Sequence, residues 1–148
     1  MVFLEPSRHT ILLVDDDRDF RDAFADLLRL DGHVVVEAST GEAALAQLDN
    51  IGMRRRGAPD LMVLDLMMPR MSGIELLQRL RRSARWADLP VLVVTGVNDP
   101  MLPVRLDLPI AFKTDTETLV SAVRQQLRRA SSEAASISAI AAASNDAE

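Results

Sequence analysis

Pro59-Asp60-Leu61-Met62-Val63-Leu64-Asp65-Leu66-Met67-Met68-Pro69 is the stretch of sequence that decides the fold. Residues 61–64 are apolar at every position, which is typical of a parallel strand covered by helices on both faces. Pro69 ends any extension of the strand, and a helical pattern follows from about Ile74. The stretch therefore predicts a buried strand that delivers the carboxylate of Asp65 to its C-terminal end, where open α/β sheets bind their ligands. Taken alone, it is also compatible with a solvated aspartate at a strand end.

Four other short apolar runs flank this one along the chain. They are expected as strands over residues 11–14, 33–37, 91–94 and 110–112. Helical patterns separate the runs, although the one between the fourth and fifth strands is weak. The alternation of strands and helices predicts one parallel sheet wound with helices on both faces, an α/β fold.

Polar side chains follow four of these five runs. Asp15 and Asp16 follow the first, Asp65 the third, Thr95 ends the fourth, and Lys113, the only lysine, follows the fifth. Because parallel strands end at the same edge of a sheet, we expect these side chains to lie together. Carboxylates suit Mg²⁺, an aspartate can act as a phosphoryl acceptor, and a hydroxyl and an ammonium can bind phosphoryl oxygens. The set predicts phosphoryl-transfer chemistry at this edge.

Several helix signals give local expectations. Phe20, Phe24, Leu27 and Leu28 form one apolar stripe, with Arg21 among the residues that face away from it. Capping boxes are expected to start helices at Ser39 and at Thr114, each with a glutamate three residues later. The last helix is expected to run over residues 117–129. His33, which stands at the turn into a strand, is expected to be an ordinary surface or edge histidine.

Composition excludes several classes of protein. The 148 residues are 48% hydrophobic with a net charge of −5, which argues against a nucleic-acid or anionic-membrane surface. There is no cysteine, so disulfides and thiolate sites are excluded. No apolar run approaches the roughly 20 residues that span a bilayer, and no signal-peptide core follows the first four residues. We expect a soluble, cytoplasmic protein.

The motifs together resemble the receiver domain of two-component response regulators. The matching pieces are Ile11-Leu12-Leu13-Val14-Asp15-Asp16-Asp17, Leu64-Asp65-Leu66-Met67-Met68-Pro69 with Gly73, Thr95 after an apolar strand, and Lys113 after another. The resemblance covers residues of about 10 to 129. It implies a flavodoxin-like fold, a five-stranded parallel sheet of order 2-1-3-4-5.

The resemblance also implies a function. Asp65 would receive a phosphoryl group from a histidine kinase or a phosphotransfer protein, and Thr95 and Lys113 would bind that group. Asp15, Asp16, Asp65 and the backbone carbonyl of Met67 would bind Mg²⁺. Such a protein is a signalling switch or relay that accepts phosphate, not an enzyme that turns over a separate substrate.

The chain departs from the family pattern in the region before and after Lys113. Thr114 replaces the proline that usually follows the lysine, which makes the placement of Lys113 and a cis Lys113–Thr114 bond open questions. Ile110 replaces the usual aromatic switch residue. Pro100, Pro103 and Pro109 interrupt residues 97–109, so the fourth helix is expected to be short or absent, at most a turn near residues 104–107.

The expected organisation is a lead-in over residues 1–9, a receiver domain over 10–129 and an Ala/Ser-rich tail over 130–148. The tail is expected to extend the last helix by a turn or two and then to fray. No output domain is recognisable, which suggests a stand-alone receiver. The kinase, the downstream protein and the oligomeric state are not determined by the sequence, and a homodimer is possible. A basic triplet, Arg54-Arg55-Arg56, is expected in a solvated loop.

Two other functions are compatible with these residues. A binding module that keeps the fold but works without phosphorylation would explain the loss of the proline, the aromatic residue and a regular fourth helix. A small phosphatase using an aspartyl phosphate would need a general acid two residues after Asp65. Met67 occupies that position, and a thioether cannot donate a proton.

Overall fold

The computed structural model describes residues 8–52, 57–96, 101, 105–113 and 115–145. Its centre is a five-stranded parallel sheet of order β2-β1-β3-β4-β5. The strands are β1 (Thr10–Val14), β2 (Val34–Ala38), β3 (Leu61–Leu64), β4 (Val91–Thr95) and β5 (Ile110–Phe112). This order confirms the flavodoxin-like fold expected from the sequence.

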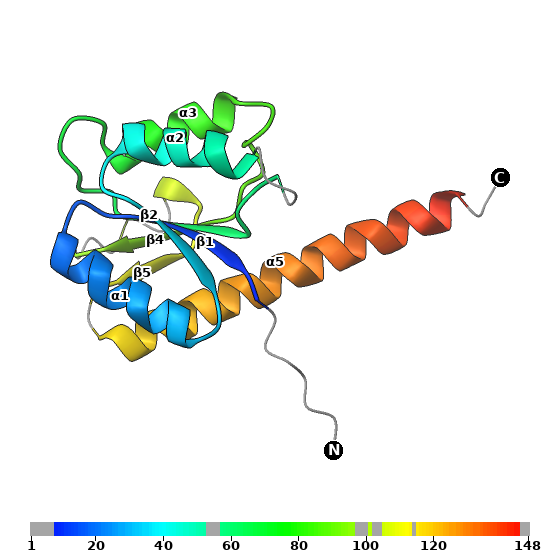
Figure 1. Ribbon diagram of the computed structural model, residues 1–148. Coiled ribbons are helices and arrows are strands. Elements are labelled where there is room, and N and C mark those ends of the chain that lie inside the picture. The colour runs from blue at the N-terminus through cyan, green and yellow to red at the C-terminus, as the bar shows by residue number, and fades with distance from the viewer. Residues whose placement is uncertain (1–7, 53–56, 97–100, 102–104, 114, 146–148) are drawn as a thin grey trace, which may run out of the picture.

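Helices cover both faces of the sheet (Figure 1). They are α1 (Arg18–Leu30), α2 (Gly41–Gly52), α3 (Gly73–Arg82) and α5 (Thr116–Asn145). Alternate residues of β1 point to opposite sides. Leu12 and Val14 join the apolar cluster under α2 and α3, while Ile11 and Leu13 join the cluster under α1 and α5. Burial on both faces is why the strands are apolar at consecutive positions.

The helices start one residue later than the capping boxes predict. The hydroxyl of Thr40, not Ser39, accepts a hydrogen bond from the amide of Ala43 at 3.0 Å. At α5, the carboxylate of Asp115 accepts from the amide of Thr118 at 2.7 Å, while Thr114 lies outside the described residues. The prediction that Ser39 caps α2 was wrong, because several neighbouring residues can cap a helix and Thr40 takes this place. The prediction for Thr114 falls outside the described residues.

The apolar stripe of α1 packs as expected, but one of the residues placed opposite it does not face solvent. Phe24 and Leu28 are fully buried in the core. The side chain of Arg21 is only 14% exposed and lies 3.3 Å from Glu37. Its guanidinium also donates to the carbonyl of Asp15 at 2.7 Å. Arg21 thus turns away from the apolar stripe, but its long side chain reaches back over the ends of β1 and β2 instead of into solvent.

His33 is half-buried just before the edge strand β2, in agreement with the surface or edge position expected for it. Its side chain is 6% exposed and lies 3.7 Å from the carboxylate of Asp31. Its Nδ1 accepts a hydrogen bond from the backbone amide of His9 at 3.3 Å. The turn into β2 lies beside the start of β1. Arg124 of α5 lies at the same place and makes two hydrogen bonds to the carboxylate of Asp31.

The segment between β4 and β5 contains a short helical turn in its described part. Arg105 and Leu106 are helical, and the amide of Arg105 donates to the carbonyl of Met101 at 3.1 Å. The backbone then turns at Asp107, which has a φ of 50°. This agrees with a short fourth helix. Residues 97–100 and 102–104, and the basic triplet at 54–56, lie outside the described part of the chain.

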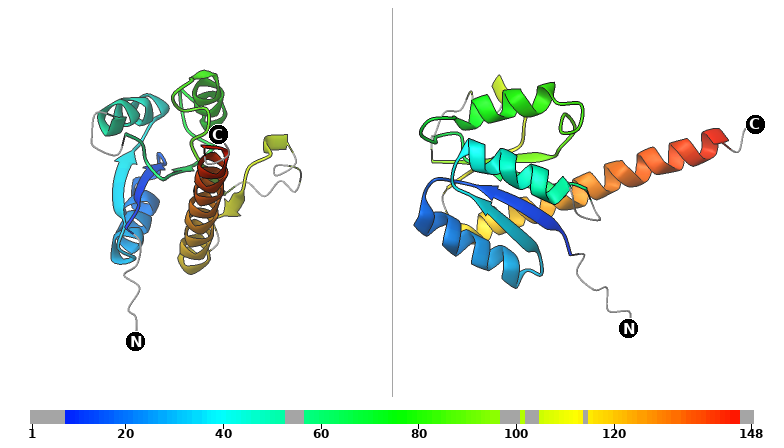
Figure 2. Two further views of the ribbon diagram at one scale, coloured as in Figure 1. Left: turned by 90° about the vertical axis from the view of Figure 1, so that its right-hand side faces the viewer. Right: turned by 45° about the horizontal axis from the view of Figure 1, so that its top comes forward.

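Helix α5 is longer than expected. It continues without a break to Asn145, well beyond the one or two turns predicted after residue 129. Figures 1 and 2 show its second half projecting away from the sheet and its covering helices. In the described part of the chain, no helix combines the length and apolar character that crossing a bilayer requires.

Candidate functional site

The parallel register brings the functional side chains to one edge of the sheet. Val14 pairs with Leu64, so Asp15 and Asp65 follow neighbouring strand ends, and the amide of Asp65 donates to the carbonyl of Val14 at 3.0 Å. On the other side, the amide of Lys113 donates to the carbonyl of Thr95 at 2.9 Å. The backbone therefore sets the relative positions of these residues before their side chains interact.

Three carboxylates form an acidic cluster at this edge. Asp15, Asp16 and Asp65 each offer an oxygen, and these oxygens lie within 4.8 Å of one another. Asp15 and Asp65 are buried, at 1% and 5% exposure, while Asp16 is exposed. Oxygen donors, two of them fixed and one open to solvent, fit a hard divalent cation such as Mg²⁺, which keeps several of its waters.

Lys113 balances part of this negative charge. Its ammonium lies 2.7 Å from Oδ2 of Asp15 and 3.4 Å from Oδ2 of Asp65. Burial would lower the pKa of Lys113, but the hydrogen bond and charge of Asp15, helped by Asp65, raise that pKa above its ordinary value. Lys113 thus reaches the acidic residues although no proline follows it. The Lys113–Thr114 bond itself lies outside the described residues.

The two buried carboxylates are also held by backbone amides. Oδ1 of Asp15 accepts from the amide of Asp17 at 2.8 Å, and Oδ1 of Asp65 accepts from the amide of Met67 at 3.1 Å. Burial raises the pKa of Asp15, and the hydrogen bonds from Lys113 and Asp17 oppose this rise. The carboxylates are therefore positioned by hydrogen bonds on one oxygen, and in both residues Oδ2 faces Lys113.

Phe20 is a residue of the site that sequence reasoning assigned only to the core. The Lys113 ammonium lies 4.4 Å from the centre of its ring, within the range of a cation–π interaction. Phe20 stands in the first turn of α1, three residues after the helix-capping Asp17. Phe20 lies close in sequence to the acidic run at Asp15, and this closeness could have indicated a place at the site. The lysine that it contacts, however, is 93 positions away in the sequence.

Thr95 and Met67 complete the edge. Thr95 is fully buried at the end of β4. Met67 exposes 65% of its surface beside the acidic cluster, while Met68 and Met71 of the same loop are buried. Gly73, at the end of this loop, packs directly against the backbone after β3. A Cβ at this position would overlap the carbonyl oxygen of Asp65 and the Cα of Leu66. The structure thus brings Asp15, Asp16, Asp65 and Lys113 together. Met67 lies in the loop after Asp65, and Thr95 lies at the end of the neighbouring strand β4.

Comparison with known proteins gives a family match. Residues 11–106 match the family described as response regulator receiver domain. The transcriptional regulatory protein CpxR of Klebsiella pneumoniae is 39% identical over 126 residues, which cover 80% of this chain and 49% of that protein. The chain spans about half the length of curated relatives that it matches, CpxR among them.

Solved structures agree with this match. A response regulator receiver protein from Pseudomonas putida has a TM-score of 0.68 and 31% identity, covering 80% of this chain and 98% of that one. The N-terminal domain of a response regulator receiver protein from Methanoculleus marisnigri has a TM-score of 0.64 and 30% identity, covering 79% and 94%.

Proposed function

The chain belongs to the response regulator receiver domain family, and from this premise we propose that Asp65 accepts a phosphoryl group from a histidine kinase or a phosphotransfer protein. A receiver domain is a signalling phosphoacceptor, not an enzyme that turns over a separate substrate. The observation that carries the proposal is the convergence of Asp15, Asp16, Asp65 and Lys113 at one edge of the sheet.

The proposed reaction moves one phosphoryl group. A carboxylate oxygen of Asp65 attacks the phosphorus, an acyl-phosphate bond forms, and the bond from phosphorus to the nitrogen of the donor's phosphohistidine breaks. The amide of Met67 holds Asp65 in place, and Lys113 neutralises charge on the phosphoryl oxygens. The hydroxyl of Thr95, at the end of the adjacent strand, is proposed to donate to a phosphoryl oxygen.

Mg²⁺ is the proposed cofactor. The carboxylates of Asp15, Asp16 and Asp65 and the backbone carbonyl of Met67 would hold it. It would supply charge neutralisation between the carboxylate and the incoming phosphoryl group. Lys113 now sits between the two buried carboxylates, so it is the group that must adjust when a phosphoryl group arrives.

A binding module that acts without phosphorylation is the second candidate, and one observation favours it. Ile110, which replaces the aromatic switch residue, is partly buried and packs against the core together with Leu106 and Leu108. An isoleucine at this position has no aromatic ring that could move between solvent and core. If Asp65 is phosphorylated, output would therefore use a route other than this position.

The experiment is labelling with a small acyl-phosphate donor in the presence of Mg²⁺. The wild-type protein should acquire a base-labile acyl phosphate, and Asp65→Asn should abolish it. Asp26→Asn is a matched control, since the Asp26 side chain is 77% exposed on α1 and should not affect labelling. Full labelling of the Asp65 variant would refute the assignment, and a wild-type protein that takes no label would favour the second candidate.

The partners follow from this proposal in general terms. The donor is a histidine kinase or phosphotransfer protein, and the expected compartment is the cytoplasm. Some relatives are named transcriptional regulators, but this chain covers only about half of their length. The aligned part carries the receiver match, so we propose a signalling domain and assign no DNA-binding activity to it.

A further inference from the structure

The second half of α5 carries an apolar stripe that continues a buried one. Within the domain, Val120, Val123 and Leu127 pack against the sheet and are buried. The same seven-residue pattern goes on with Ala130, Ala134, Ile137 and Ala141. Ala130 is half-buried and the later members are exposed, with Ile137 at 68% and its neighbour Ile140 at 67%. The stripe thus extends beyond the sheet, which covers only its first half.

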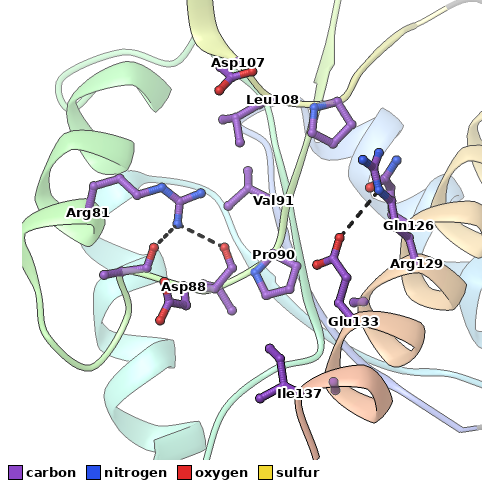
Figure 3. Close-up of a pocket in the computed structure, with 15 residues that line it drawn as sticks. Arg81, Asp88, Pro90, Val91, Asp107, Leu108, Gln126, Arg129, Glu133 and Ile137 are labelled. Atoms are coloured by element: carbon purple, nitrogen blue, oxygen red, sulfur yellow. Dashed lines mark hydrogen bonds and ion pairs between the residues drawn. The ribbon is translucent and has the colours of Figure 1, made fainter. Parts of the chain in front are cut away.

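A groove lies beside this stripe. It has a volume of about 900 Å³ and is walled on one side by α5, including Ala130, Glu133, Ala134 and Ile137. Figure 3 shows Glu133 and Ile137 on this wall and Val91 and Leu108 across from it. Pro90 and Leu89 add apolar surface to the groove next to the exposed part of the helix. Charged and polar residues line it as well, among them Arg81, Asp88 and Asp107.

We propose that a second copy of this chain covers the stripe, with its own α5 packed antiparallel along the exposed half and into the groove. A two-fold interface requires a self-complementary surface, and the stripe meets this requirement. In antiparallel alignment Ile137 of each copy faces Ala134 of the other, and Ala130 faces Ala141. Large side chains then oppose small ones, which allows close packing of the two helices.

Charge selects the antiparallel orientation. Arg128 and Arg129 stand at the start of the projecting half. A parallel pair would place the arginines of one copy beside those of the other. An antiparallel pair brings the basic start of each projecting half level with the C-terminal, negative dipole end of its partner's α5. The opposed dipoles favour the same arrangement.

The first test is the molecular mass of the full chain in solution, by light scattering and by sedimentation across concentration. The wild-type protein should have about twice the mass of 16.3 kDa. Ala134→Glu in the stripe should shift it to a monomer. Ala139→Glu, the same substitution on the opposite face, should leave the dimer intact. A monomeric wild type, which would leave the face to a different protein, or a dimer indifferent to Ala134→Glu, would overturn the proposal.

The second test uses the absence of cysteine from the chain. An equimolar mixture of Ala130→Cys and Ala141→Cys proteins should form a mixed disulfide dimer several times faster than either variant alone. Rapid self-cross-linking of the Ala130→Cys protein would indicate parallel helices and overturn the orientation. Neither test requires phosphorylation, so the dimer and the proposed acceptor role can fail independently.

Discussion

At the scale of single residues, Lys113 is the side chain on which the charge balance of the acidic site depends. It contacts both buried carboxylates and lies over the ring of Phe20. Two buried carboxylates on neighbouring strand ends repel each other, and an ammonium between them removes part of this cost. Burial would lower the pKa of Lys113, but the contacts with Asp15 and Asp65 outweigh it and raise that pKa, so Lys113 stays charged throughout the physiological range.

His33 gives a pH-dependent prediction at the residue scale. Burial lowers the pKa of His33; Asp31 and Asp60 oppose this, while His9 and Arg124 reinforce it. As the pH falls below about 6.5, the unfolded chain binds the proton more readily than the folded one, so the free energy of unfolding falls. The decrease for one proton is at most about 1.4 kcal/mol per pH unit.

Urea unfolding between pH 7.5 and 5.5 checks this prediction. The slope of the free energy of unfolding against pH should be smaller in His33→Gln than in the wild type, whatever the variant's absolute stability. Equal slopes would mean that His33 does not titrate differently in the folded and unfolded states.

At the scale of elements, the contact between Gly73 and the loop after β3 connects α3 to Asp65, the proposed phosphoacceptor. The first turn of α3 lies against the backbone of Asp65 and Leu66. Ser72 caps this helix by accepting from the amide of Glu75 at 3.2 Å. The start of α3 and the backbone after Asp65 therefore cannot move independently.

Gly73→Ala should destabilise the fold by about 1–3 kcal/mol, because the new Cβ would overlap backbone atoms that cannot rotate away. Gly96→Ala is the matched control, since a Cβ there meets nothing within 4 Å. Its effect should stay within about 0.5 kcal/mol. The fluorescence of Trp86, the single tryptophan, can follow urea unfolding of both. Similar stabilities for the two variants would disprove the close contact.

At the scale of the whole molecule, the proposed Mg²⁺ site would couple cation binding to folding. Its ligands come from the ends of β1 and β3, which are 50 residues apart in sequence, so the unfolded chain has no such site. A cation that binds only the folded state stabilises it by about 1.4 kcal/mol for each tenfold excess over its dissociation constant. Mg²⁺ should therefore raise the melting temperature of this protein.

Asp16→Asn should abolish most of that rise, because it removes a charged ligand from the cluster. Asp17→Asn is the control, since asparagine can replace the aspartate that caps α1. Thermal unfolding with and without Mg²⁺, and after chelation, measures the effect. The prediction fails if Asp16→Asn keeps the full Mg²⁺ response.

The sequence by itself determined the layout of the sheet and of the acidic edge. A continuous apolar run indicates a strand that is buried on both faces. The residue at or after the end of each run is the one at the functional edge of the sheet, so the sequence alone places Asp15, Asp65 and Thr95 there, together with Lys113. Both features depend only on residues close together in the sequence, so they can be recognised without knowing which segments pack against them. The resemblance to receivers supplied the strand order.

The tertiary structure alone decided what depends on distant neighbours. Periodicity identifies an apolar face of α1, but not that Arg21 reaches Glu37 or that Phe20 lies under Lys113. It places His33 at a turn, but not beneath the corner closed by Arg124. The length of α5 was also underestimated, because an Ala/Ser-rich segment has weak periodicity and its helix grows from a nucleus that the domain provides.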